Sequence, residues 1–164
     1  MVPEVGRSEL LAMVRSAHAD WEALLREIPP AWLTEPGLPG GWSVKDVIAH
    51  ITWGEREALG LMAARALVGS DLWRLTDDER NAIVFQQNRH RDLDDVLAES
   101  REIFTRYLEA LEALSEEDLN DPRRFAGMPL DWRPWRVLYD PHHYQHHAAD
   151  IRAWLETRWK TETA

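Results

Sequence analysis

The strongest constraint on the fold is the spacing of apolar residues, which recur at three- and four-residue steps through most of the chain. This spacing gathers apolar side chains on one face of a helix. The sequence has no alternating apolar and polar stretch longer than a few residues, no internal repeat and no low-complexity tail. The pattern therefore predicts an all-α protein.

The first two helical segments have recognisable boundaries. Residues 8–28 carry the first apolar stripe, and Pro29 ends it because proline cannot continue a helix. A loop rich in proline and glycine follows. The second stripe covers residues 43–69, where a capping box starts at Ser43 and Gly69 is the expected end.

The third helical region begins with another capping box at Thr76 and extends to residue 115. It forms either one bent helix or two helices. Residues 116–132 are expected to be mostly loop. The last segment, residues 133–159, is helical but contains Pro141, which either kinks the helix or occupies its first turn with Asp140 as the cap.

Four long helices with one short extra piece predict a four-helix bundle with long connecting loops and a kinked or broken last helix. A chain of 164 residues fits one domain, residues 1–164. The absence of cysteine excludes a disulfide framework, a cysteine zinc site and a cysteine nucleophile.

The formal net charge of −10 argues against a protein that holds nucleic acid through its phosphates. The N-terminal residues lack a basic region followed by an apolar run, so no signal peptide is expected. No stretch approaches 18 uncharged apolar residues, so no membrane span is expected either. These features predict a soluble cytoplasmic protein.

Four of the seven histidines lie between His142 and His147. Histidines four residues apart share one face of a helix, and the cluster offers two such pairs: His142 with His146, and His143 with His147. Continuing by fours leads from the second pair to the apolar residues Ile151 and Leu155, and from the first pair to Asp150. The pair His143 and His147 is therefore predicted to face the core.

Two imidazoles at this spacing can share one divalent metal, but a third ligand must come from elsewhere. His50 lies at the edge of the apolar stripe of the second segment, and Gly54 one turn later leaves room for a metal or a ligand. His18 and His90 are expected at or near the surface. From spacing alone, the inward pair fits a metal site or core histidines that hydrogen-bond to neighbours.

Two stretches, "GWSVKDVIAHITWGERE" and "HHYQHHAADIRAWL", resemble the second-helix and last-helix motifs of the DinB-like superfamily of four-helix-bundle proteins. The loop "IPPAWLTEPGLPGGWSVKD" is most similar to the branch that includes the colibactin self-resistance protein, the ClbS/DfsB branch. The resemblance covers nearly the whole chain. It implies a divalent metal, zinc or nickel, bound by His50, His143 and His147. Pro141 departs from the pattern and could shift the pair relative to His50.

A metal held by three imidazoles keeps an open position, where water has a lowered pKa or a thiol binds as thiolate. The resemblance therefore implies a detoxification enzyme for a small electrophilic or genotoxic metabolite. It would work by hydrolysis or by transfer of a low-molecular-weight thiol. Asp46 and Glu57 share the helix side of His50 and are candidate acid–base residues. Their structural alternatives are a capping acid for Asp46, and for Glu57 a surface residue or an acid that orients a ligating histidine.

Two other functions stay open at this stage. Nine tryptophans could fill the core and subunit interfaces, or line an apolar pocket that binds a small molecule without catalysis. The pocket candidates flank the two histidine motifs: Trp42, Trp53, Trp132 and Trp135. Alternatively, the bundle forms a homodimer and any metal serves stability. The sequence does not choose between enzyme, binding protein and structural bundle.

Overall fold

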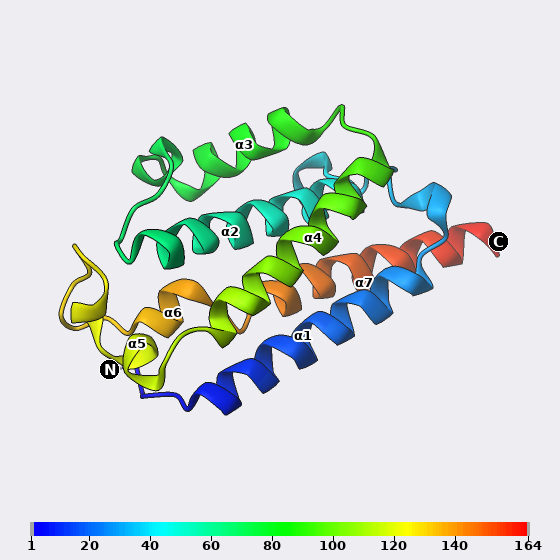
Figure 1. The fold of residues 1–164 in the computed structure, drawn as a ribbon. Coiled ribbons are helices and arrows are strands. Elements are labelled where there is room, and N and C mark those ends of the chain that lie inside the picture. Colours follow the sequence, from blue (N-terminus) through cyan, green and yellow to red (C-terminus); the bar gives the residue numbers. More distant parts are fainter. Residues whose placement is uncertain (1, 164) are drawn as a thin grey trace.

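The apolar stripes pack against one another as a bundle of long helices (Figure 1). The computed structural model describes residues 2–163. Its bundle consists of α1 (Arg7–Glu27), α2 (Val44–Ala64), α4 (Leu93–Glu112) and α7 (His143–Glu162). Helix α2 packs mainly on α4, and α1 packs on α7 and α4. The predicted all-α bundle is confirmed.

The remaining elements are shorter. Helix α3 (Asp77–Asn88) lies against α2 outside the four-helix bundle, whereas α5 (Glu116–Asn120) and α6 (Pro134–Leu138) lie together near one end (Figure 1). Short 3₁₀ turns lie in the connections: η1 (Pro30–Trp32), η2 (Pro39–Gly41), η3 (Asp71–Arg74) and η4 (Pro122–Arg124). None of the helices described is both long and apolar enough to cross a membrane.

Both predicted capping boxes are present. The Ser43 side chain accepts from the backbone of Asp46, whose carboxylate accepts in return, and Thr76 does the same with Glu79. A third capping box at Ser115 begins α5, inside the stretch predicted to be mostly loop. Five helical residues are too few to show a periodic apolar stripe, so the pattern could not reveal them.

Helix α2 ends at Ala64, five residues before the predicted stop at Gly69. Arg65 has a left-handed backbone with φ 50°, which ends the helix. Its carbonyl then accepts from the Ala126 amide at 2.9 Å, and its guanidinium pairs with Asp118 at 2.7 Å. Partners more than fifty residues along the chain therefore set this boundary, not the local glycine.

The third region is two helices, and α2 stabilises the break between them. Lys45 is buried in the first turn of α2, and its ammonium donates to the carbonyls of Arg89 and Arg91, both at 2.8 Å. These carbonyls follow the end of α3 and would otherwise lack a partner inside a helix. The last segment is likewise broken into α6 and α7.

Residues 139–142 connect α6 to α7, and Pro141 lies in a turn immediately before α7. The Asp140 carboxylate accepts from the His142 amide at 3.1 Å, so it satisfies one free N–H at the start of the helix. Of the two predicted roles, Pro141 thus introduces the last helix and does not kink it.

Two apolar clusters form the core, and α2 contributes to both. Residues 44–51 join the cluster that contains Trp21, Ile151 and Leu155, whereas Ala58 and Met62 join the one that contains Leu10, Leu111 and Phe125. The part of α2 between them, residues 52–57, lies where the two clusters meet. The candidate site occupies this junction.

Candidate metal centre

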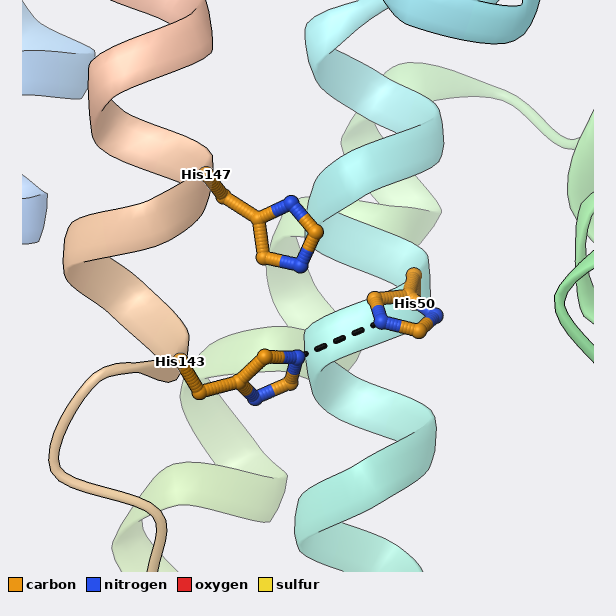
Figure 2. Close-up of side chains that lie close together, drawn as sticks. All are labelled: His50, His143 and His147. Atoms are coloured by element: carbon orange, nitrogen blue, oxygen red, sulfur yellow. Dashed lines mark hydrogen bonds between the residues drawn. The ribbon is translucent and has the colours of Figure 1, made fainter. Parts of the chain in front are cut away.

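Three histidines from two helices point toward one another (Figure 2). His50 comes from α2, and His143 and His147 come from the first two turns of α7. One ring nitrogen from each lies within 4.8 Å of those of the other two. The Nε2 atoms of His50 and His143 are 3.2 Å apart. The structure therefore brings together the three predicted ligands.

The spacing of these nitrogens suits a tetrahedral metal ion. Zinc–nitrogen bonds of roughly 2.0–2.1 Å at a tetrahedral angle place two ligand nitrogens roughly 3.3 Å apart. The distance between His50 and His143 is close to this value. Imidazole also suits zinc and nickel, so the donor set fits either ion.

A free second ring nitrogen on His50 also fits a ligand role. The Nδ1 atom of His50 and the Oδ1 atom of Asp46 are both buried without a hydrogen-bond partner within the described chain. The two residues are four apart on α2 and so share a helix face. Ligating histidines usually donate their second ring N–H to a carboxylate or carbonyl, which orients the ring. Within the described residues these two atoms do not bond to each other, so the second ring nitrogen of His50 is free for such an acceptor.

Burial keeps the three imidazoles uncharged near neutral pH. The pKa of His50 is lowered to about 4, mainly by burial and also by the neighbouring His143 and Arg80. The pKa of His147 is lowered to about 3 by burial and by the other imidazoles. Burial also lowers the pKa of His143, although the nearby Asp140 carboxylate opposes the shift. Neutral imidazole is the form that binds metal.

A cavity of about 370 Å³ opens beside the cluster. His50 and His143 form part of its wall, and Gly54 lies between them, where a Cβ would be 3.8 Å from the His143 ring. Its other lining residues include five aromatic ones, Trp53, Trp73, Tyr107, Tyr139 and Tyr144, and the charged Glu55, Asp77, Arg80 and Asp140. This volume is near the small end of the roughly 300–1,000 Å³ typical of ligand pockets.

Of the four predicted pocket tryptophans, Trp53 lines this cavity. Trp42 stacks on Phe85 with ring centroids 5.6 Å apart and also contacts His50 from outside the cavity. Trp135 packs in the other core cluster, and Trp132 is 44% exposed. Trp73 lines the cavity but was not predicted, because η3 carries no periodic pattern that places it there.

The two predicted acid–base residues lie outside the cavity wall. Asp46 is occupied by the capping box, where its Oδ2 accepts from the Ser43 amide at 2.8 Å. Glu57 accepts from the Ser70 amide at 3.0 Å and from the Trp73 indole at 2.7 Å, so it holds the η3 segment beside the cavity. Both residues thus have structural partners.

A different carboxyl group, Glu55, lies on the cavity wall. It is buried, and the Tyr144 hydroxyl donates to it. Burial raises its pKa to about 7, although the Tyr144 bond opposes the shift. The sequence held a sign of this residue, because Glu55 falls in step with the buried residues Ile51 and Ala58 of α2. A carboxylate on an apolar stripe indicates a buried acid.

His18 and His90, which were predicted at or near the surface, lie outside the three-histidine group. His90 is exposed. His18 is half-buried on α1 and stacks on Phe104, with ring centroids 3.4 Å apart.

The helical bundle and its three converging histidines define a protein of the DinB-like class. The chain belongs to the mycothiol maleylpyruvate isomerase N-terminal domain family, which it matches over residues 14–152. It also has the fold of a crystal structure of an uncharacterised protein from Escherichia coli UTI89. That likeness has a TM-score of 0.77 and 14% identity, and it covers 96% of each chain. No curated protein matched the sequence.

Proposed function

We propose that the protein is a metal-dependent detoxification enzyme that adds a thiol or water to a small electrophile. The observation that carries the proposal is the convergence of three neutral imidazoles at the wall of a cavity of about 370 Å³. The narrower placement in the ClbS/DfsB branch is part of the same proposal and rests on the sequence motifs. Zinc and nickel are the proposed metals.

A thiol is the favoured nucleophile. The family takes its name from a mycothiol maleylpyruvate isomerase, and mycothiol is a low-molecular-weight thiol. An ion bound by His50, His143 and His147 would supply a Lewis acid that lowers the pKa of a bound thiol or water.

The cavity wall supplies groups that can position a small substrate. Trp53 and Trp73 contribute indole rings to its lining. The Arg80 guanidinium lies over the Trp73 ring at 4.6 Å from its centroid and also lines the cavity. This guanidinium also pairs with Asp77, so an anionic substrate or thiol would share it with that carboxylate.

The proposal is tested first by elemental analysis of protein purified without a histidine tag. The parent should carry about one zinc or nickel ion per chain, and His50→Ala and His143→Ala should lose it. His146→Ala is the matched control, because His146 is exposed on the same helix and lies outside the cluster. The metal-loaded parent should then consume model electrophiles such as epoxides and activated alkenes in the presence of thiols.

Two results would contradict the proposal. One is a parent that takes up neither zinc nor nickel. The other is a metal-loaded parent that turns over no electrophile with any thiol or with water. Tight, inert binding of apolar compounds by metal-free protein would instead support the binding function, which the aromatic cavity wall also suits.

A further inference from the structure

The cavity beside the histidines contains an acid that the proposed metal centre leaves unused. Glu55 lies five residues after His50 on α2, and only 9% of it is exposed. It lines the same cavity as His50 and His143. A molecule bound in this cavity next to the imidazoles would therefore also be next to the Glu55 carboxyl.

Glu55 has no cationic partner among the described residues, since none of their ion pairs involves it. Its hydrogen bond comes from a neutral donor, the Tyr144 hydroxyl. Several titratable groups from the packed elements line the same cavity: Tyr107 of α4, Tyr139 and Asp140 of the 139–142 connection, His143 and Tyr144 of α7, Asp77 and Arg80 of α3, and His50 of α2. His18 of α1 reaches it through Tyr144.

The one cation in this group is engaged elsewhere. Arg80 pairs with Asp77 and lies over the Trp73 ring. Because burial is not compensated by a cation, the pKa of Glu55 rises to about 7, with the Tyr144 bond opposing the rise. A carboxyl group with a pKa near the working pH can both accept and donate a proton during a reaction.

We propose that Glu55 is the catalytic acid–base residue of the cavity and that Tyr144 is its positioning residue. This inference rests on the proposed function. It narrows the substrate class to small electrophiles that add H–S or H–O across a bond, such as epoxides, strained rings and activated alkenes.

The proton balance of such an addition needs no further reactant. The neutral Glu55 carboxyl gives its proton to the oxygen or carbon that receives the electron pair of the breaking bond. The nucleophile forms its new bond to the electrophilic carbon with its own electron pair. Its S–H or O–H proton passes to the Glu55 carboxylate and restores the acid. The net result is addition of the nucleophile and its proton to the electrophile.

The test compares Glu55→Gln with Glu102→Gln. Glutamine keeps the size of Glu55 and can still accept from Tyr144, but it cannot carry the proton. Glu102 is an exposed acid on α4 and serves as the control. Both variants should bind the metal of the parent. Glu55→Gln should turn over substrate about 100-fold more slowly or worse, and the change of its rate with pH near pH 7 should disappear. Glu102→Gln should stay within about threefold of the parent.

A second measurement does not depend on activity. Carbon-13 NMR of the side-chain carboxyls in metal-free protein should show one resonance that titrates near pH 7 in the parent and in Glu102→Gln. It should be missing in Glu55→Gln. In Tyr144→Phe the same resonance should titrate at a higher pH, because the lost hydrogen bond favoured the charged form. This variant also serves as the test if Glu55→Gln fails to fold.

The outcomes separate the two proposals. An active parent with an unimpaired Glu55→Gln variant, or a Glu55 carboxyl that titrates near 4.5, overturns the role of Glu55 and leaves the metal-dependent function standing. A parent without metal and without turnover overturns the proposed function, and this inference with it.

Discussion

Two buried carboxyl groups, Glu55 in the cavity wall and Asp118 on α5, have different partners. Glu55 is 9% exposed and faces a cavity with a tyrosine as its donor, whereas Asp118 is 4% exposed and lies between two arginines. Burial raises the pKa of both groups. For Asp118, hydrogen bonds from Arg65, Arg124 and Ser115 outweigh burial and hold the pKa well below its usual range.

The difference shows what decides the role of a buried acid. The two acids are similarly buried. Asp118 stays charged because two arginines surround it, whereas Glu55 titrates near neutral pH because no cation pairs with it. Asp118 lies on α5 and pairs with Arg65 at the end of α2 and with Arg124 in η4, so it holds these three elements together. The side-chain hydrogen bond that the structure shows for Glu55 comes from the Tyr144 hydroxyl.

The largest expected effect is on the pH dependence of stability. Between pH 4.5 and 7 the unfolded chain has lost the Glu55 proton while the folded protein keeps it, so stability falls as pH rises through this range. The loss is about 3 kcal/mol relative to Glu55→Gln, at about 1.4 kcal/mol per pKa unit. Urea titrations of metal-free parent and variant across this range measure it. Parallel pH curves would show that Glu55 is an ordinary acid.

Removing the charge of the anchor should cost less. Asp118→Asn loses the charged hydrogen bonds to two arginines that are 42% and 46% exposed, so solvent screening limits the loss to about 2 kcal/mol. The depressed pKa means that this stability is present above pH 3.8 and disappears as the pH falls below it. The exposed Asp20→Asn, as control, should change urea stability by less than about 0.5 kcal/mol. If Asp118→Asn lost no more stability than Asp20→Asn, the Asp118 ion pairs would not stabilise the fold.

The contrast between these acids also separates what sequence could predict from what it could not. Periodicity and the capping boxes at Ser43 and Thr76 gave the bundle, because helix boundaries of this kind depend on residues three or four apart. The inward direction of His143 and His147 followed from the same local phase. His50 needed the resemblance, since its own phase lies at the edge of the stripe.

Long-range partners explain the remainder. Asp118 and Arg65 are more than fifty residues apart, so no local pattern could show that their ion pair ends α2 before Gly69. The position of Glu55 on an apolar stripe was visible, but its lack of a cation is a property of the packed elements around it. The apolar spacing of the sequence can therefore show that an acid is buried. Whether that acid forms ion pairs, as Asp118 does, or can exchange a proton, as proposed for Glu55, depends on the residues that the fold packs around it.

A smaller effect is expected at two glycines of α2, Gly54 in the cavity wall and the exposed Gly60. Gly54→Ala and Gly60→Ala should each stabilise the protein by about 0.5–1 kcal/mol, because alanine restricts the unfolded chain and favours the helix. A Cβ at Gly54 meets the His143 ring at an ordinary 3.8 Å, and one at Gly60 has no atom within 4 Å. Thermal melts should show similar gains. If Gly54→Ala alone lowered stability, the Cβ would have less room beside the His143 ring than the 3.8 Å separation indicates.

The smallest effect is expected in metal affinity between pH 7.5 and 5.5. Three imidazoles of ordinary pKa 6.5 would each be about nine-tenths protonated at pH 5.5, and proton competition would weaken binding about 1,000-fold. Here burial, with His143 and Arg80 contributing, lowers the pKa of His50 to about 4, and burial with the other imidazoles lowers that of His147 to about 3. Zinc affinity should therefore fall less than about tenfold, as measured against a chelator corrected for its own protonation. A 1,000-fold fall would mean that these imidazoles titrate as if in water, and the cavity would then be too wet to hold a neutral Glu55.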